Sequence, residues 1–291
     1  FVGSEPGSVI GVYDATDPAA PVLRQLLPSG IGPEGLLPIP QRNLFFTANE
    51  TDLGADGAAR SHVMIYELQD APAAYPQLTS AGMEELTGWG AISGMVAGDD
   101  GMLYAINDSA YGAQPTIFVI DLSSQPARII RAIRITRDGA PAQNMDMEGI
   151  TLDGEGGFWV VNEGRTDRDI PHALYHVDAE GAITEEVLLP EALLSQETRF
   201  GFEGVTLVDG TLWMAVQREW QDDAEGMVKL VAYTPASGEW GAVHYPLAAH
   251  ERGWVGLSEI VAHDGHLYLV ERDNQLGDLA AVKQITRIAL E

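Results

Sequence analysis

Short apolar runs alternate along this chain with turns built on glycine, and one such pattern occurs five times. Each copy starts with Glu or Ser, continues as an apolar run into a glycine turn, and ends in an aromatic-containing run followed by Asn or an acid. The copies start at Glu34, Ser93, Glu148, Glu203 and Ser258, at intervals of 59, 55, 55 and 55 residues. A fixed period of this length is typical of stacked or radial repeat folds.

Each copy predicts a β-hairpin, because its two apolar runs flank turns such as Asp153-Gly154 and Asp209-Gly210. A second hairpin follows most copies, so the unit has four strands in about 55 residues, within the range of a propeller blade. Sustained helical periodicity is absent from the sequence, and Glu191–Leu194 predicts one helical turn at most. The second hairpins are expected at 117–121 with 129–135, 173–177 with 185–189, and 230–233 with 243–247.

We therefore predict an all-β fold, a β-propeller of about five four-stranded blades, or six if one blade is degenerate. A β-sandwich is the alternative, which the near-equal spacings disfavour. The runs at 8–14 and 22–27 form an outer hairpin, and the chain ends after one outer strand at 284–290. The last blade is then short, so we expect N-terminal strands to pair with C-terminal ones and close a single domain over residues 1–291.

The pattern of strands at the two ends of the chain is also consistent with a fragment of a longer propeller. The chain starts at Phe1 with neither an initiator Met nor a signal sequence, as in a processed or truncated protein.

Composition and charge narrow the classes of function. With 291 residues and 45% hydrophobic content, the chain is long enough to bury one large core. No apolar run approaches the roughly 18 residues of a membrane span, so membrane insertion is not expected. The 43 acidic and 16 basic residues give a formal charge of −27, which argues against nucleic-acid and anionic-membrane partners. The lack of cysteine excludes disulfides, thiolate chemistry and cysteine-ligated zinc.

The repeated acids are expected at one mouth of the central channel of the propeller. In a blade, the loop that enters the first strand and the loop that leaves the second lie on the same face. Asp146 lies two residues before the entrance residue Glu148. The entrance residues are Glu34, Ser93, Glu148, Glu203 and Ser258, and the exit residues are Asn49-Glu50, Asn107-Asp108, Asn162-Glu163, Gln217 and Glu271.

Several carboxylates around one axis repel one another unless a cation neutralises them. Ligands that are all oxygen atoms suit Ca²⁺ best, with Mg²⁺ or Mn²⁺ as alternatives. We therefore expect a calcium site at the mouth; the alternative is that the acids only cap strands and bind backbone amides of neighbouring blades. The expected metal ligands are Glu34, Asp146, Glu148, Asn162, Glu203 and Glu271. The residues expected to bind the substrate are Asn49, Asn107 and Asp108.

Known nucleophile and cofactor motifs are absent from the sequence. Ser93 lies in GAISG rather than G-x-S-x-G, and there is no P-loop, dinucleotide fingerprint or H-E-x-x-H. His62, His172 and His250 fall in or near loops on the acidic face, and His250 is the candidate proton acceptor among them.

From about Trp89 to Leu290 the chain resembles the phytase-like domain described as esterase-like activity of phytase. The matching segments are ISGMVAGDDGMLYAINDS, DMEGITLDGEGGFWVVNEG, RFGFEGVTLVDGTLWMAVQRE and GLSEIVAHDGHLYLVERDN, followed by Lys283. The N-terminal part, with VIGVYDATDPAAPVLRQLL, GPEGLLPIP and LFFTANE, is similar instead to the closing repeats of a larger alkaline-phosphatase-like propeller of exported bacterial proteins.

The resemblance implies a β-propeller, a secreted or periplasmic bacterial protein, and calcium-assisted hydrolysis of phosphate or related esters. Glu163 and Arg272 are the implied catalytic residues, since a guanidinium beside acids can receive a phosphate in a bidentate manner. The alternative for Arg272 is a buried salt bridge to a Glu of a neighbouring blade. The site residues that the motifs imply are Asp146, Glu148, Glu163, Arg199, Glu203, Glu271, Arg272 and Asp273.

The leading prediction is a metal-assisted hydrolase of a small-molecule ester. Two alternatives stay open: a lactonase-type metal-dependent hydrolase, and a non-catalytic propeller that binds a protein or small ligand at its acidic mouth. The sequence does not separate phosphomonoester, phosphotriester and lactone substrates, and it carries no signal for an oligomeric state.

Overall fold

The structure, a computed structural model, describes residues 1–56, 60–71, 77–108, 114–165, 168–275 and 279–290. It is all-β, with 54% of the residues in strands and 4% in helices. The chain forms two compact units, Phe1–Gln77 with Gln275–Ala280, and Leu78–Asn274 with Ala281–Glu291. No helix in the described ranges is long and apolar enough to cross a membrane.

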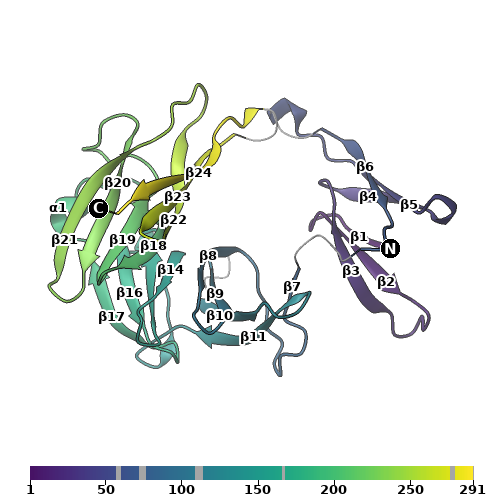
Figure 1. The fold of residues 1–291 in the computed structure, drawn as a ribbon, viewed down its shortest axis with the longest axis horizontal. Helices are drawn as coiled ribbons and strands as arrows, with labels where there is room; N and C mark the ends of the chain where they lie inside the picture. The colour runs from purple at the N-terminus through teal and green to yellow at the C-terminus, as the bar shows by residue number, and fades with distance from the viewer. Residues whose placement is uncertain (57–59, 72–76, 109–113, 166–167, 276–278, 291) are drawn as a thin grey trace. The chain divides into compact units, whose positions relative to one another are not determined.

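The first unit consists of two antiparallel three-stranded sheets, β1-β2-β3 and β4-β5-β6 (Figure 1). The Tyr66 hydroxyl donates a 2.5 Å hydrogen bond to the Pro28 carbonyl and so ties the second sheet to the first. The elements are β1 (Val2–Ser4), β2 (Val9–Asp14), β3 (Val22–Pro28), β4 (Pro33–Ile39), η1 (Pro40–Arg42), β5 (Leu44–Asn49), η2 (Gly54–Asp56) and β6 (His62–Glu67).

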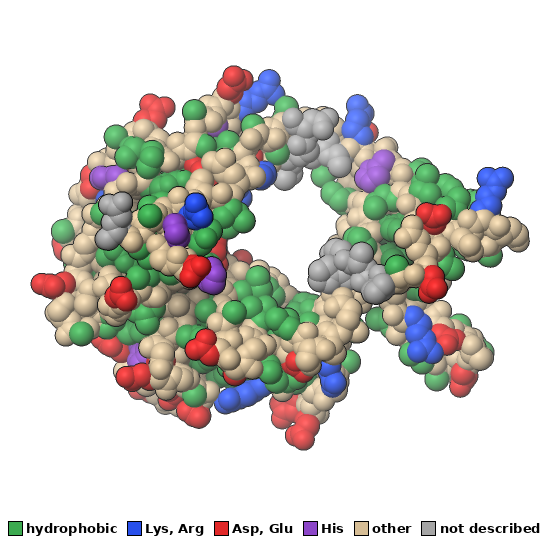
Figure 2. Space-filling view, in the orientation of Figure 1, with side chains coloured by type: hydrophobic (Ala, Val, Ile, Leu, Met, Phe, Trp, Pro, Cys, Tyr) green, Lys and Arg blue, Asp and Glu red, His purple; other side chains and the backbone are tan. Residues whose placement is uncertain are grey.

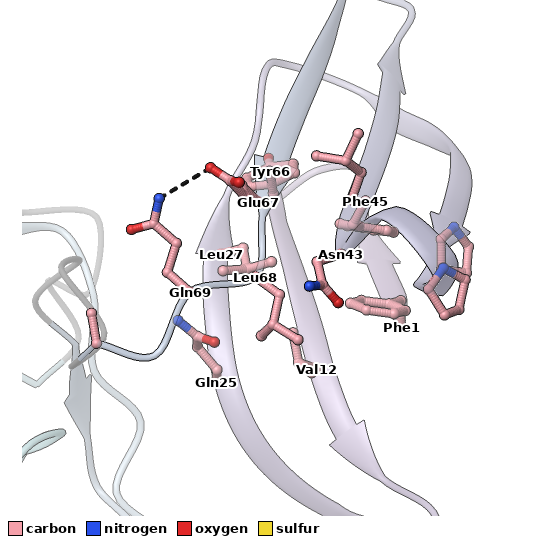
Figure 3. Close-up of a pocket in the computed structure, with 14 residues that line it drawn as sticks. Phe1, Val12, Gln25, Leu27, Asn43, Phe45, Tyr66, Glu67, Leu68 and Gln69 are labelled. Atoms are coloured by element: carbon pink, nitrogen blue, oxygen red, sulfur yellow. Dashed lines mark hydrogen bonds between the residues drawn. The ribbon is translucent and has the colours of Figure 1, made fainter.

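A hollow of about 530 Å³ lies in this first unit (Figure 3). Phe1 and Phe45 line it as a stacked pair, with ring centroids 4.0 Å apart. The Gln69 amide donates a 3.1 Å hydrogen bond to Glu67 at its edge. The acids of the repeats do not line this hollow.

The described part of the second unit contains four successive larger sheets, antiparallel except for the parallel pair β7–β11, and the two-stranded sheet β12-β13 (Figure 1). The strands are β7 (Leu78–Thr79), β8 (Ile92–Ala97), β9 (Met102–Asn107), β10 (Thr116–Asp121), β11 (Ala127–Arg134), β12 (Thr136–Arg137), β13 (Ala140–Pro141), β14 (Met147–Leu152), β15 (Phe158–Asn162), β16 (Ala173–Val177), β17 (Ile183–Leu188), β18 (Phe202–Val208), β19 (Thr211–Val216), β20 (Met227–Thr234), β21 (Glu239–Pro246), β22 (Val255–His263), β23 (His266–Asp273) and β24 (Lys283–Ala289), with one helix, α1 (Glu191–Leu194).

Within this unit the first strands of consecutive sheets are neighbours: β8 lies beside β14, β14 beside β18, and β18 beside β22. The outer strands β11, β17 and β21 lie on the convex side of the arc (Figure 1). This is the blade order expected of a propeller, and all three predicted second hairpins are confirmed, as is the single helical turn.

The sheets pack face to face through apolar side chains. Between the sheets β14–β17 and β18–β21, the buried Trp159 and Val161 pack with Phe202, Met214 and Tyr233. Trp159 is 5% exposed, which confirms its prediction as a core residue. Burying one large apolar side chain contributes about 1.5–3 kcal/mol, so these inter-sheet layers hold the inner strands together.

Two of the Asp-Gly turns show why the repeats need these residues. Asp209 and Gly210 have φ values of 47° and 78°, and Asp264 and Gly265 have 52° and 73°. Positive φ at both central residues defines the tight turn that matches the twist of antiparallel strands.

β2 pairs with β1 and β3, and β24 pairs with β23 in a three-stranded last sheet. The strand β1 was not predicted from the sequence. The pairing of N-terminal with C-terminal strands stays a prediction, as does closure into a ring of five blades.

Acidic side chains are scattered over the visible surface and outnumber basic ones there (Figure 2), as the formal charge of −27 requires. The acids of the repeats are exceptions, because several of them are partly or fully buried together.

Candidate functional site

The first residue of every repeat lies at a β-bulge. In the pair β14–β15, Met147 is opposite Asn162 and Gly149 is opposite Val161, which leaves Glu148 without a partner. A bulge kinks the strand and turns one side chain away from the regular alternation. The residues skipped in this way are Glu34, Ser93 (with Gly94), Glu148, Glu203 and Ser258.

The glycine after the bulge allows neighbouring inner strands to approach closely. A Cβ on Gly149 would lie 2.7 Å from the Cα of Gly204, and one on Gly94 would lie 2.8 Å from the Glu148 carbonyl oxygen. Real Cβ atoms do not tolerate such distances, so only glycine fits. The Glu-Gly pair therefore brings the strands together and turns its acid toward their common end.

Backbone hydrogen bonds join the entrance of each hairpin to its exit, as the sequence predicted. The Glu163 amide donates a 2.8 Å hydrogen bond to the Asp146 carbonyl, which places both residues at one end of their sheet. The equivalent bonds run from Glu50 to Gly32, from Asp108 to Ala91 and from Gln217 to Gly201.

Three predicted acids of the second unit meet at this end. One carboxylate oxygen from each of Asp108, Asp146 and Glu148 lies within 4.8 Å of the other two. Asp146 is 5% exposed, and its backbone amide donates a 2.6 Å hydrogen bond to the Asn162 side chain. We call Asp108, Asp146, Glu148, Glu163 and Glu203 the acidic mouth.

Burial changes the acidity of three members of the mouth. It raises the pKa of Glu148 to about 9; the Ser93 hydroxyl opposes this shift, and the charges of Glu203, Asp108 and Asp146 add to it. Burial also raises the pKa of Glu203 to about 8, with repulsion from Glu163 adding to the shift. Burial and the charges of neighbouring acids thus disfavour ionisation of both carboxylates, which is the condition that a bound cation relieves.

Two arginines act on the Glu163 carboxylate, in contrast to Glu148. Burial and the Asp146 charge raise its pKa to about 7, while Arg199 and Arg165 oppose the rise. Arg272 acts in the same way on Glu203 and donates a 2.8 Å hydrogen bond from Nε to the Ser258 hydroxyl. The predicted residues Arg199 and Arg272 therefore lie at the edge of the acidic mouth.

Four predicted residues point into their own sheets instead. Asn107 accepts a 2.9 Å hydrogen bond from the Thr116 amide, and Asn162 donates a 2.9 Å hydrogen bond to the Pro171 carbonyl. Glu271 is 1% exposed and accepts hydrogen bonds from the Ala248 amide and, at 2.7 Å, from the Gln284 amide group. Neighbouring residues of a strand face opposite sides, so the second residue of each exit pair faces the mouth and the first does not.

Asp273 is the fourth of these residues. Its carboxylate accepts hydrogen bonds of 2.6 Å and 2.7 Å from the amides of Ala281 and Val282, and it forms a 2.5 Å salt bridge with Lys283. It holds the connection into β24 in place.

Three further predicted residues lie apart from the described contacts of the mouth. His250 is exposed in the loop between β21 and β22. Glu34 and Asn49 belong to the first unit, where Glu34 is exposed and Asn49 donates a 3.3 Å hydrogen bond to the His62 carbonyl.

Gln217, an exit residue expected at the mouth, donates a hydrogen bond to the Glu203 carboxylate. The structure also adds two residues that sequence reasoning missed. Arg218 follows Gln217 and lies between the rings of Phe200 and Trp254. Glu259 occupies the glycine position of the fifth repeat, and burial raises its pKa to about 8. An alignment of the five copies already isolates Glu259, since the other four have glycine there.

Residues 87–291, more than half of the chain, match the phytase-like family described as esterase-like activity of phytase. The chain belongs to this family. No curated protein matches it. The resemblance seen in the sequence is thereby confirmed for the second unit.

Solved structures show similarity at low identity. A GH43 β-1,3-galactosidase bound to galactodeoxynojirimycin is 10% identical, with 88% of this chain and 89% of that chain covered and a TM-score of 0.45. Hydrazine synthase of Kuenenia stuttgartiensis is 13% identical, with 87% and 67% covered and a TM-score of 0.43. A PQQ-bound aldose sugar dehydrogenase of Streptomyces coelicolor is 14% identical, with 98% and 88% covered and a TM-score of 0.38.

Proposed function

We propose that this protein is a divalent-cation-assisted hydrolase of phosphate or related esters that works at the acidic mouth. The observation that carries the proposal is the approach of Asp108, Asp146 and Glu148, whose carboxylate oxygens lie within 4.8 Å of one another. Membership of the phytase-like family supports hydrolysis as the reaction class. Fold and family alone do not assign a substrate.

The residues of the mouth fit a hard cation. All donors are oxygen atoms, which favours Ca²⁺ and, after it, Mg²⁺ or Mn²⁺. Burial and neighbouring acids raise the pKa values of Glu148 and Glu203, and a bound cation would oppose this rise. Asp108, Asp146 and Glu148 would hold the ion, and a bound ion would supply polarisation of the ester oxygen and activation of water.

Glu163 is suited to accept the proton of the attacking water. Its pKa of about 7 lies near the neutral range, where a general base combines ionisation with useful basicity. Arg272 is suited to bind the substrate, since its Nε is fixed by Ser258 and its terminal N–H groups form no salt bridge within the described residues. Arg272 also attracts the Glu203 carboxylate of the neighbouring sheet, so an ionic role beside that glutamate stays the alternative.

The test is a panel of chromogenic phosphomonoesters, phosphotriesters, carboxylic esters and lactones, each assayed with EDTA and with added calcium. Turnover that EDTA abolishes and calcium restores is the expected result. Turnover of lactones alone would favour the lactonase alternative. No turnover of any member, with intact calcium binding, would overturn hydrolysis and leave a binding propeller. The five-bladed closed ring and export from the cell belong to this proposal and need their own tests.

A further inference from the structure

Beside the acidic mouth, the Arg218 side chain lies between two aromatic rings. Its Cζ atom is 4.6 Å from the ring centroid of Phe200 and 4.9 Å from that of Trp254. The Trp254 ring also has the Cζ atom of Arg272 at 5.2 Å. Two guanidinium groups thus share one indole ring.

Arg218 has no carboxylate partner among the described residues, in contrast to three exposed or half-buried arginines of the chain. Arg24, Arg60 and Arg137 form salt bridges of 2.8–3.0 Å with Asp14, Asp52 and Glu186. Arg218 forms no hydrogen bond or salt bridge within the described residues, and its Nε is buried without a partner. In a chain with 43 acidic and 16 basic residues, an arginine left to aromatic faces needs an explanation.

The aromatic rings fix the position of this cation. A guanidinium over an aromatic face gains about 0.5–2 kcal/mol, and its planar group keeps its N–H donors free at the edge. Such a group is prepared to bind an oxyanion, because two parallel N–H groups match two oxygen atoms.

The backbone places Arg218 next to the mouth. It follows Gln217, whose side chain donates to Glu203. A Cβ on Gly256 would lie 2.6 Å from the Gln217 carbonyl oxygen and 3.4 Å from the Arg218 Cγ, so glycine lets the start of β22 pass against these residues. Arg218 and Arg272 therefore flank the boundary between two sheets, beside the acid that Arg272 influences.

We propose that Arg218 is a specificity-determining residue that, with Arg272, binds an anionic oxygen group of the substrate, either a phosphoryl or a carboxylate group. This inference rests on the proposed function for the reacting end of the substrate. It adds that substrates with an anionic group are selected over neutral esters and lactones. The acids would hold the cation, and the arginines would bind the anionic oxygen atoms of the substrate.

The first experiment measures anion binding without turnover. Inorganic phosphate and malonate are titrated by calorimetry into wild type, Arg218→Met, Arg218→Lys and the control Arg287→Met, an exposed arginine on β24. We expect Arg218→Met to weaken the preferred anion at least about tenfold, Arg218→Lys to weaken it less, and Arg287→Met to leave it unchanged. Preference for phosphate or for malonate identifies the group. Equal affinity in wild type and Arg218→Met, or no binding of either anion by wild type, would overturn the proposal.

The second experiment compares 4-nitrophenyl phosphate with the neutral 4-nitrophenyl acetate in the presence of calcium. We expect Arg218→Met to raise KM for the phosphate at least about tenfold and to leave KM for the acetate within twofold. Anion binding that depends on Arg218 without any turnover would retain this site and refute the hydrolase. If Arg218→Met does not fold, Phe200→Leu removes one face of the sandwich, and unchanged anion affinity in that variant and in Arg218→Lys together would refute the site.

Discussion

Ser93 and Glu148 hold the same position in two neighbouring repeats, and the Ser93 hydroxyl donates a hydrogen bond to the Glu148 carboxylate. The bond crosses from the bulge of β8 to the bulge of β14. It favours the ionised carboxylate and opposes the rise of its pKa. The repeat that lacks a glutamate thus supports the glutamate of the next repeat, and the mouth has fewer charges to neutralise than five equal repeats would give.

Removal of the Glu148 charge is expected to weaken calcium binding. Glu148→Gln keeps the size of the side chain but removes one of three carboxylates within 4.8 Å of one another. A cation that binds only the folded state stabilises it by about 2.7 kcal/mol at 100 times its Kd. We expect the melting temperature of wild type to rise across a calcium titration and that of Glu148→Gln to rise much less.

Asp153→Asn is the matched control for this titration. Asp153 caps the turn of the same hairpin through the amides of Glu155 and Gly157, away from the mouth. This variant should melt at a lower temperature than wild type with an unchanged calcium response. Parallel curves for wild type and Glu148→Gln would refute the calcium site.

Gly149→Ala is expected to destabilise the protein by about 2–3 kcal/mol through overpacking. The new Cβ would lie 2.7 Å from the Cα of Gly204, and backbone cannot move aside as a flexible side chain can. Gly241→Ala is the control, because no atom lies within 4 Å of its new Cβ and its φ is compatible with alanine. Urea unfolding should show a large loss for the first variant and little change for the second.

The repeat could be found from sequence because one blade needs the same residues wherever it occurs. Asp-Gly turns, alternating strands and the Glu-Gly pair recur, so the hairpins were predicted correctly. The strand β1 was missed, since three residues (Val2–Ser4) carry too little pattern to be recognised.

The candidate site was predicted less completely, for a physical reason. The repeat predicted which segments meet. The direction in which each exit side chain points depends on the strand register at the bulge, which the repeat does not show. Asn162 and Glu271 are predicted metal ligands, and the structure shows Asn162 accepting from the Asp146 amide and Glu271 accepting from the Ala248 amide. Arg218 holds the second exit position of its repeat, as Asp108, Glu163 and Arg272 do, but the repeat does not show its aromatic partners, which come from separate entrance loops.

Glu271→Gln is expected to lower stability equally with calcium and with EDTA. The Glu271 carboxylate accepts hydrogen bonds from the Ala248 amide, the Gln284 side chain and, at 3.3 Å, the Tyr245 hydroxyl. Loss of a buried charged acceptor costs about 1.5–3 kcal/mol. Guanidinium unfolding in both conditions gives the comparison, and a loss that appears only in calcium would assign Glu271 to the metal after all.

Stability without calcium is expected to fall as pH rises. The ordinary pKa of a glutamate is 4.5, whereas burial raises the pKa of Glu148 to about 9 and those of Glu203 and Glu259 to about 8. Between these limits the folded protein keeps protons that the unfolded chain has lost, so the free energy of unfolding decreases with pH. The contribution of these three glutamates to the free energy of unfolding is fully present below pH about 4.5 and is lost above pH about 9.

A bound cation reverses part of this trend, because it favours the ionised carboxylates. The calcium-induced rise in melting temperature should therefore grow from pH 5 to pH 8, and calcium binding should release protons, which calorimetry in buffers of different ionisation enthalpy detects. Glu148→Gln should flatten part of the pH dependence measured in EDTA. A melting temperature in EDTA that rises steadily from pH 5 to pH 9 would show that these carboxylates are not the buried, uncompensated acids of the acidic mouth.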